Sequence, residues 1–571
     1  MFFGRDGERL DGAGFDVSLG NPPYVRSRNV PDEQKEYYKE SFRTLEGAFD
    51  LYILFIEQSH KIAHSNSFIV PNKWTTTGYG RKIRDALLDD YGLSDVLNVS
   101  DLDVFPDADI YPIVYTTAED PQDSVRIHSV NNPNNLDDAP VSEVPRSFID
   151  SLGDRVLPIE LEPDFTPIAE RVMDETGVLG NWISMTEAIH TGNMRDELIV
   201  SESSGPECEP LIGGSEIDRY EIEWEGRWIR YDPEMIEESD DGYGDLRDRE
   251  LFERDEKLFI RDISYRPVAV YDDQQYFALN TLYSVSSHDE FDHSLRFVES
   301  IFNSEFVNKF FRQIYGGTHV SGGYLRFKPM FSYNIPVPTD ERLKKSNSVT
   351  DNPIEKLSSC SETIEAAKSQ KQKLNLSLSS HFGDFECVNA LVDPGLVQPV
   401  GDSSSRLYST TKEYPNLRIG TATVDRESPN TALIKATARY KPEDEDAHET
   451  DRWGYTETDL LPAFRITDLT ETEADLIEHF VPVAVDEAGG FANFRETATK
   501  TNSLVDRLQA IELPDPDDVA DDLANYLRTV ERAEELDAKI EKTDALIDEI
   551  VYELYGLTDE EIEIVEEAVG E

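Results

Sequence analysis

The sequence predicts an α/β protein of several domains, in which a partial Rossmann-like sheet is followed by a mixed β-rich region and then by C-terminal helical and β segments. Short apolar runs alternate with helical patterns over residues 1–150, as in a sheet whose strands are connected by helices. Beyond residue 150 the apolar runs become shorter, contain Trp and Tyr, and are separated by turn residues, which is typical of β-rich structure. A chain of 571 residues with 38% apolar residues can build several cores.

The elements of the first region follow from hydrophobic periodicity. Four short apolar runs predict strands, and two amphipathic stretches between them predict helices. The strands are expected at residues 15–20, 67–70, 96–99 and 111–115, and the helices at residues 50–64 and 81–91.

Changes of composition and periodicity predict five segments along the chain. They are an α/β segment at 1–150, a β-rich domain at 151–340, a helical spacer at 341–400, a β-rich segment at 401–500 and a helical segment at 501–571. The last segment contains an apolar stripe at helical spacing, which we interpret as a packing face. Its residues are Leu536, Ile540, Ile547, Val551 and Leu554.

The charge balance is strongly acidic. Against 116 Asp and Glu the chain has only 54 Lys and Arg, so its net charge is −62. Such a charge repels nucleic acid in dilute salt. Acidic residues spread over every region nevertheless suit a protein that works in molar salt, where the Debye length falls to about 3 Å. We therefore interpret the composition as halophilic, with the charge reflecting habitat rather than partner.

Several classes of protein are excluded by the sequence. No apolar run approaches the roughly 18 residues of a spanning helix, and no basic segment precedes an apolar stretch at the start, so neither a membrane protein nor a secreted protein is expected. Only three cysteines are present, without CxxC spacing, which argues against a disulfide framework or a zinc site. We expect no metal and a cytoplasmic location.

In so acidic a chain, the segments without Asp or Glu are informative. The two longest are residues 306–339 and 58–84, and each contains several cations. Contact with a polyanion explains both properties, whereas a buried core explains only the missing acids. The cations singled out as polyanion contacts are Lys73, Arg81, Lys82 and Arg84 in one segment, and Lys309, Arg312, Arg326 and Lys328 in the other. A shorter acid-free segment, residues 428–442, carries Lys435, Arg439 and Lys441.

The motif Asn21-Pro22-Pro23-Tyr24 directly follows the predicted strand at residues 15–20. Open α/β sheets bind ligands at this edge, where strands end. An exocyclic amine of a nucleobase is a poor nucleophile, and it must be held and rehybridised rather than deprotonated. The Asn21 side-chain oxygen and a backbone carbonyl at Pro22 can accept its two N–H bonds, while proline stiffens the loop. Tyr24 offers a ring on which the base can stack.

At these residues the sequence resembles the adenine-N6 DNA methyltransferases of the type II G restriction-modification group with a TaqI-like specificity domain. The resemblance implies that residues 1–150 are the C-terminal half of a methyltransferase catalytic domain. It also implies transfer of a methyl group from S-adenosylmethionine to a flipped adenine of double-stranded DNA, with Asn21, Pro22, Pro23 and Tyr24 as catalytic residues. By the same resemblance, Phe55 contacts the cofactor and Phe105 stacks on the flipped base opposite Tyr24. Both phenylalanines have a simpler alternative in ordinary core or loop packing.

The resemblance continues through the middle of the chain, where Pro210-Leu-Ile-Gly-Gly-Ser-Glu-Ile, Lys257-Leu-Phe-Ile-Arg and Asn334-Ile-Pro-Val-Pro resemble the specificity domain of that group. It therefore implies DNA recognition at residues 151–340, which include the longest acid-free segment. The charge pattern had indicated a polyanion contact in the same place.

One departure from the family concerns the cofactor pocket, whose glycine-rich turn and acidic ribose contacts belong well before the Asn-Pro-Pro-Tyr motif. We expect the missing half to be supplied by a separate N-terminal methyltransferase or restriction subunit. One alternative is a non-catalytic DNA-specificity subunit or an inactive remnant. Another is a glutamine-amide methyltransferase that acts on protein, against which the long region after the sheet argues.

Overall fold

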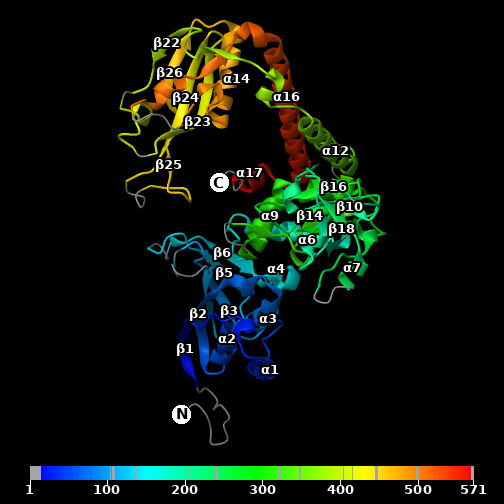
Figure 1. The fold of residues 1–571 in the computed structure, drawn as a ribbon. Coiled ribbons are helices and arrows are strands. Elements are labelled where there is room, and N and C mark those ends of the chain that lie inside the picture. Colours follow the sequence, from blue (N-terminus) through cyan, green and yellow to red (C-terminus); the bar gives the residue numbers. More distant parts are fainter. Residues whose placement is uncertain are drawn as a thin grey trace, which may run out of the picture. The chain divides into compact units, whose positions relative to one another are not determined.

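The computed structural model describes residues 14–102, 104–105, 110–134, 138–203, 205–237, 242–318, 323–345, 349–402, 404–414, 416–443, 448–496 and 501–567. The chain divides into two compact units, one of residues 1–368 with 539–571 and the other of residues 369–538. Helices α12 (Pro353–Gln372) and α16 (Pro516–Tyr555) carry the chain from one unit to the other and back (Figure 1). The five segments expected from the sequence stay a prediction, because their boundaries are not those of the two units.

The first unit begins with a six-stranded mixed sheet of order β1-β2-β4-β3-β5-β6. Its strands are β1 (Phe15–Gly20), β2 (Ala63–Pro71), β3 (Leu93–Asn98), β4 (Pro112–Thr117), β5 (Ser124–Ser129) and β6 (Val141–Pro145). The pairs β1/β2 and β3/β5 are parallel and the other pairs are antiparallel. This sheet confirms the predicted α/β class, and all four expected strands are present within a few residues.

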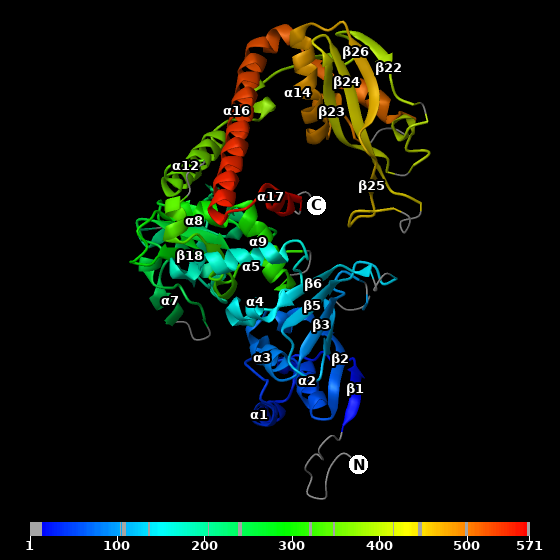
Figure 2. The ribbon, with the colours of Figure 1, turned by 180° about the vertical axis from the view of Figure 1, so that it is seen from behind.

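Helices connect and cover this sheet, as Figure 2 shows from behind. They are α1 (Asp32–Ser41), α2 (Tyr52–His60), α3 (Arg81–Asp89) and α4 (Arg146–Ser151). The parallel pair β1/β2 requires a crossover connection, and α2 provides it. Tyr52, Ile53 and Ile56 of α2 are fully buried in the core that the helix shares with the sheet. The two helices expected from the sequence are therefore confirmed as α2 and α3.

Strand β1 forms an edge of the sheet, because β2 is its only partner among the described strands. Three alternate apolar residues of β1 are exposed: Phe15, Val17 and Leu19, the last of them by 77%. Alternate residues of a strand share one face, so these side chains form an apolar stripe along the edge. In the inner strands β2 and β4 most apolar side chains are instead buried, and Ile69 and Val114 are partly buried. A long apolar edge normally needs a cover or a pairing partner.

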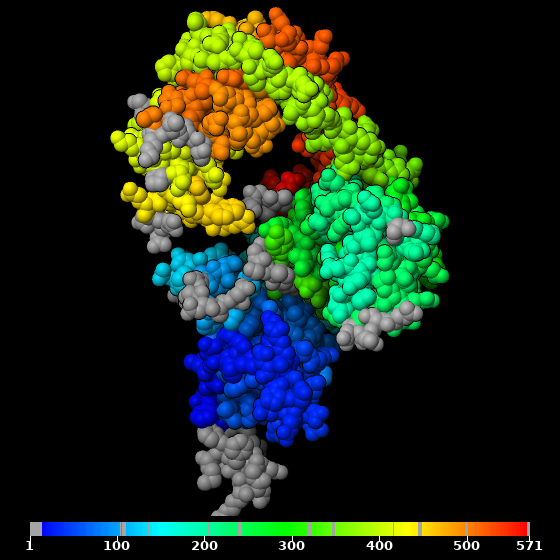
Figure 3. Space-filling view, in the orientation of Figure 1, coloured from blue at the N-terminus to red at the C-terminus, as the bar shows by residue number. Residues whose placement is uncertain are grey.

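The β-rich region of the first unit contains two four-stranded sheets, of order β17-β10-β13-β9 and β16-β14-β18-β8. The longer strands are β8 (Ile183–Glu187), β10 (Cys208–Ile212), β14 (Lys257–Arg261), β16 (Ala269–Asp272) and β18 (Leu282–Ser287). Helices α8 (Leu295–Phe302) and α9 (Glu305–Tyr315) follow and share a hydrophobic core with the first sheet. In the space-filling view, this region lies directly against the residues of the first sheet (Figure 3).

The end of α16 and helix α17 (Asp559–Glu567) return to the first unit. Leu536, Ile547, Val551 and Leu554 of the apolar stripe are buried, and Ile540 is partly buried. The expected packing face is thus confirmed. Most of the stripe belongs to the same core as the first sheet and the β-rich region.

The second unit is built on a five-stranded antiparallel sheet, in which β22, β26, β24 and β23 lie in this order and β25 also pairs with β24. Its strands are β22 (Leu396–Pro399), β23 (Arg418–Ser428), β24 (Thr431–Tyr440), β25 (Thr456–Glu457) and β26 (Leu461–Thr467). Helix α14 (Glu471–Glu487) packs on one face of this sheet, where alternate residues of β24 are buried. The opposite face of β24 stays partly exposed. Among the helices that the structure describes, none combines the length and hydrophobicity that crossing a membrane requires.

Candidate active site

The Asn-Pro-Pro-Tyr loop leaves the carboxyl end of β1, beside the strand β2 that runs parallel to it. Gly20 ends β1, and a Cβ atom there would lie 2.9 Å from the Phe68 ring. Glycine therefore lets β1 approach β2 closely just before the loop begins. The loop is then fixed downstream, because Leu51 N donates to Val25 O and Ser27 N donates to Phe49 O, at 2.9 and 2.7 Å.

The Tyr24 side chain is half-buried and held in one orientation. Its hydroxyl donates to the Ile69 carbonyl at 2.9 Å, and its ring meets the Tyr52 ring edge-on at 6.3 Å between centroids. Burial raises the pKa of Tyr24 to about 12, so the hydroxyl stays protonated at neutral pH. Tyr24 is therefore a fixed aromatic wall beside the loop.

The structure brings Tyr24 and Phe105 together, as the resemblance implied, although they are 81 positions apart in the sequence. Their ring centroids are 6.1 Å apart and the rings are almost perpendicular, at 82°. This arrangement is a favourable edge-to-face contact. Because a base stacked between two rings needs them roughly parallel, the pair must open before it can hold a base. Pro106, the residue after Phe105, lies outside the described residues.

A chain of hydroxyls and one carboxylate lies behind Tyr24, and sequence reasoning assigned it no role. The Tyr52 and Tyr79 hydroxyls are 2.9 Å apart, and the Tyr79 hydroxyl donates to Asp50 Oδ2 at 3.2 Å. Burial raises the pKa of Asp50, while Tyr79 and the charges of Arg26 and Lys73 oppose the shift. Asp50 precedes α2, and its backbone pairs with that of Arg26, next to the loop, in an isolated antiparallel β-bridge. The signal in the sequence was the Asp-Leu-Tyr motif at residues 50–52.

Asn21 and the two prolines of the loop differ from one another in exposure. Asn21 and Pro23 are exposed, whereas Pro22 is buried. No hydrogen bond or ion pair joins the Asn21 side chain to the described part of the chain. Its amide oxygen is therefore available to accept a hydrogen bond from a ligand that enters beside Tyr24.

Phe55 lies on α2 with 47% of its surface exposed, while its neighbours Leu54 and Ile56 are buried. The packing alternative for Phe55 is therefore wrong. Phe55 is a further exposed apolar side chain of this segment, besides Phe15, Val17 and Leu19 of β1. Exposed apolar side chains of this size are available to contact a ligand or partner.

The cations that the sequence predicted as polyanion contacts in the acid-free segment at residues 58–84 are largely engaged within the protein. Arg84 is 1% exposed, and its guanidinium donates to the carbonyls of Trp74, Thr77 and Asp154 at 2.5 to 3.2 Å. Burial lowers the pKa of Arg84 to about 10. The predicted phosphate contact is therefore wrong for Arg84, which instead ties α3 to the segment after α4. The other three are more exposed: Arg81 lies 3.4 Å from Asp154, Lys82 donates to Leu45 O, and Lys73 is exposed beside Asp50.

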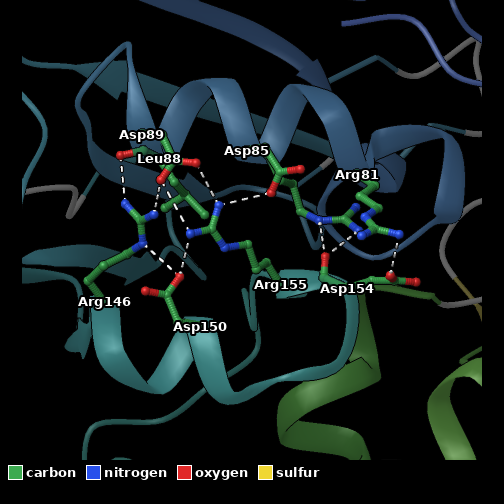
Figure 4. A network of polar contacts seen from close by, with 9 residues as sticks. Arg81, Asp85, Leu88, Asp89, Arg146, Asp150, Asp154 and Arg155 are labelled. Atoms are coloured by element: carbon green, nitrogen blue, oxygen red, sulfur yellow. Dashed lines mark hydrogen bonds and ion pairs between the residues drawn. The ribbon is translucent and has the colours of Figure 1, made fainter.

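Figure 4 shows the ion pairs around α3 that include Arg81. Arg155 lies within 2.9 Å of Asp85, Asp89 and Asp150, and Arg146 pairs with Asp89 and Asp150. Such a network fixes α3 against α4. The network explains part of the positive charge in this region without DNA, because Arg146 and Arg155 neutralise Asp85, Asp89 and Asp150.

The longer acid-free segment divides in a similar way. Lys309 is 3% exposed and pairs with Glu162 at 2.6 Å, so the prediction that it lies on a DNA-facing surface is wrong. Arg312 is half-buried and donates to the Tyr265 carbonyl. Arg326 pairs with Asp262, and the partly exposed Lys328 makes no ion pair with a described residue. Burial of α9 therefore accounts for the missing acids in the first part of this segment.

Comparison with known families agrees with this division of the first unit. Residues 4–105 match the Eco57I restriction-modification methylase family, and residues 209–337 match the TaqI-like C-terminal specificity domain. The chain therefore combines an Eco57I-type methylase segment with a TaqI-like specificity domain, which is consistent with a type IIG methyltransferase.

The similar curated proteins are type II methyltransferases. The chain is 30% identical to M.BstVI of Geobacillus stearothermophilus over 105 residues, 18% of this chain and 19% of the relative. It is 32% identical to M.XhoI of Xanthomonas vasicola over 94 residues, 16% and 17% of the two chains. It is 26% identical to the restriction enzyme and methyltransferase RM.Eco57I of Escherichia coli over 124 residues, 21% and 12% of the two chains. The match thus spans about a fifth or less of each relative.

Solved structures of protein–DNA complexes also resemble the chain. One is the type IIL enzyme MmeI in complex with DNA, at 13% identity over 62% of this chain and 50% of that chain, with a TM-score of 0.39. Another is the DrdV–DNA complex, at 9% identity over 95% and 57% of the two chains, with a TM-score of 0.37.

Proposed function

We propose that the chain is the part of a site-specific DNA methyltransferase that binds the target base and recognises the DNA, and that its product is N6-methyladenine. The observation that carries the proposal is that Asn21, whose side chain no described residue engages, precedes the fixed Tyr24 ring by three positions, and that this ring contacts Phe105. These three residues supply a hydrogen-bond acceptor and two aromatic faces. An extruded adenine requires both kinds of contact.

In this proposal Asn21 and the backbone at Pro22 accept the two N–H bonds of the adenine amino group. The acceptors then turn the nitrogen lone pair away from the ring and toward the methyl donor. Tyr24 supports one face of the base, and Phe105 turns to cover the other. Protonated Tyr24 keeps its bond to Ile69, so the ring does not have to be ordered when the base arrives.

S-adenosylmethionine supplies the electrophilic methyl group in this proposal. The exposed Phe55 ring suits one wall of its binding site, because an adenine ring can stack on it. By the resemblance, the acidic contacts to the ribose hydroxyls belong well before the Asn-Pro-Pro-Tyr motif. We therefore propose that a further α/β segment completes the cofactor pocket.

The edge strand β1 supports this proposal. Phe15, Val17 and Leu19 form an exposed apolar stripe on a strand that pairs with β2 alone among the described strands. Parallel strands in α/β sheets are normally covered on both faces. A strand of the completing segment would pair with the edge of β1 that no described strand occupies, and a helix connected to it would cover the face that carries the stripe. The completed sheet would bring the new strand next to the one that leads into the Asn-Pro-Pro-Tyr loop.

DNA as the substrate fits both the composition of the chain and the TaqI-like domain. The TaqI-like domain supports sequence recognition in double-stranded DNA, with Lys73, Arg81, Lys82, Arg312, Arg326 and Lys328 as proposed contacts to the backbone. The acidic surplus of the chain is accommodated by molar salt, which screens distant charges. We propose a halophilic enzyme that acts in the cytoplasm, where its DNA substrate is found.

The proposal is tested by identifying the product. The chain is incubated in molar KCl with duplex DNA and methyl-labelled S-adenosylmethionine, alone and with the polypeptide encoded immediately upstream. Nucleosides are then analysed by mass spectrometry. Labelled N6-methyladenine in the mixture supports the proposal, whereas labelled N4-methylcytosine, or methyl transfer to protein glutamine, contradicts it.

A second candidate is a DNA-specificity subunit without catalysis, and the TaqI-like match at residues 209–337 favours it. Such a subunit would bind a specific duplex and form no methylated base under any of these conditions. A duplex-binding assay alongside the product assay therefore distinguishes the two functions.

A further inference from the structure

The second unit contains a cation–aromatic patch at one end of its sheet, formed by Arg418, Arg439, Lys441, Arg452, Trp453 and Tyr455. It belongs to the end of the β23–β24 hairpin that lies away from the turn at residues 429–430. Arg439 and Lys441 come from the acid-free segment at residues 428–442. Neither of the two matched families extends to this part of the chain.

Three cations of the cation–aromatic patch surround one ring. Arg418 Cζ lies 4.4 Å from the centre of the Tyr455 ring, Lys441 Nζ 5.1 Å and Arg439 Cζ 5.2 Å. Arg418 and Arg439 are also direct partners in the register of β23 and β24. Like charges opposite each other on neighbouring strands are destabilising. The Tyr455 ring relieves part of this repulsion, and a bound anion would relieve more of it.

Among the described residues, one cation of the patch pairs with a carboxylate and three do not. Arg439 pairs with Asp451, whereas no described carboxylate lies within 4 Å of a charged nitrogen of Arg418, Lys441 or Arg452. The nearby Glu457 carboxylate accepts instead from the Thr437 hydroxyl.

One arginine of the patch also keeps an unused donor. Arg418 Nε is buried and has no hydrogen-bond partner in the described part of the chain. A buried donor without an acceptor is costly, so this donor favours a ligand that brings an acceptor oxygen.

The aromatic rings indicate what kind of anion fits. Trp453 is 57% exposed, and the Arg452 guanidinium lies 3.8 Å from the centre of its ring. A carboxylate of a peptide would use only the cations. A nucleic acid would use both parts of the patch, because its phosphates meet the cations while a sugar or base covers an aromatic face.

We propose that the cation–aromatic patch is a second DNA-binding surface, which contacts the phosphate backbone outside the TaqI-like domain. It rests on the proposed function in taking DNA as the ligand. A backbone contact adds affinity for any sequence and leaves the choice of sequence to the specificity domain. The patch thereby counteracts, locally, the repulsion expected between DNA and a chain of net charge −62.

The test measures binding of the full chain to fluorescent duplex DNA by anisotropy, in molar KCl. The patch variant is Lys441→Glu with Arg452→Glu, since neither side chain makes a described ion pair. The matched control is Arg495→Glu with Arg528→Glu, two exposed cations of the same unit outside the patch. Both variants change the net charge equally, so they share any long-range effect. A second pair, Lys441→Gln with Arg452→Gln, removes the charges without adding acids, and thermal melting shows that each variant is folded.

We expect the patch variant to bind at least about tenfold more weakly than the control variant, and the glutamine pair to bind at an intermediate level. Equal weakening of the patch and control variants would overturn this inference alone, because the duplex would still bind elsewhere on the chain. If the unmodified chain binds no duplex, this inference and the proposed function both fail.

Discussion

Shortening the Tyr24 side chain in two steps separates the anchoring of its ring from the support of a base. Tyr24→Phe keeps the ring and removes only the hydroxyl that donates to the Ile69 carbonyl at 2.9 Å. One such hydrogen bond contributes about 1 kcal/mol to stability. The ring of this variant still packs edge-on against Tyr52, so a base can still stack on it.

Tyr24→Ala removes the ring as well. Stacking of a base on an aromatic side chain contributes about 1–3 kcal/mol. This corresponds to a factor of about 5 to 150 in the equilibrium between the stacked and the extruded base. We therefore expect the alanine variant to lose this factor in base capture, whereas the phenylalanine variant changes by less than about fivefold.

The assay uses the duplex that the complete enzyme methylates, with 2-aminopurine in place of the target adenine. Its fluorescence rises when the base leaves the stack, so it reports the extruded fraction directly. Thermal melting of each variant separates a loss of folding from a loss of capture. If the alanine and phenylalanine variants extrude the base equally, the Tyr24 ring does not support the base, and the proposed binding of the base between Tyr24 and Phe105 is incorrect.

Three further predictions concern charged side chains of the first unit. Arg84→Met leaves three backbone carbonyls without their donor, so it should lower the free energy of unfolding by about 3 kcal/mol or more. Urea denaturation measures this, with Arg528→Met at an exposed position as the control, and an unchanged midpoint for Arg84→Met contradicts the prediction. Lys328→Glu should weaken duplex binding with no change in Tm, whereas Arg326→Glu should weaken binding and also lower Tm, because it faces Asp262. Anisotropy and melting measure the two effects, and unchanged binding by both variants contradicts the proposed contacts. Burial raises the pKa of Glu299 to about 7, so the folded state holds its proton more tightly than the unfolded state, whose pKa is about 4.3. The contribution of Glu299 to stability should therefore fall as pH rises from about 4.3 to 7, on the order of a few kcal/mol. Burial also raises the pKa of Glu160 and of Asp548 to about 7, so Glu299→Gln should make the pH dependence shallower without abolishing it; an unchanged dependence in denaturation at several pH values contradicts this.

The sheet could be predicted from the sequence because its strands are short apolar runs separated by amphipathic helices. β2, β3 and β4 extend a few residues beyond the runs that predicted them, because pairing continues into polar residues such as Asn66 and Asp95. Periodicity could not supply the strand order or the apolar stripe of β1. Both depend on which strands become neighbours and which stay at the edge.

The candidate site was predictable where chemistry restricts the residue type. Asn21, Tyr24 and Phe105 were identified from the motif and the resemblance, and the structure places Tyr24 beside Phe105. The contacts of Tyr79 with Tyr52 and Asp50 were not, because the Asp-Leu-Tyr motif at residues 50–52 does not indicate a partner 27 to 29 positions further along the chain.

The charge pattern failed for Arg84 and Lys309. An acid-free segment excludes negative charge both when it faces a polyanion and when it is buried, and the sequence alone does not distinguish these causes. Arg84 is buried among carbonyls, and Lys309 is buried against a single carboxylate, Glu162. A buried cation with its own partners therefore resembles, in the sequence, a cation that is kept for DNA.

The central claim is that the Asn21 side chain orients the amine that receives the methyl group. Its most direct test is the single-turnover rate of methyl transfer by the complete enzyme carrying Asn21→Ala, compared with the exposed Asn134→Ala as the matched control. The account predicts a rate at least about 10²-fold below that of the control, because a preorganised polar group is lost. Equal rates for the two variants, with DNA binding intact in both, would contradict it.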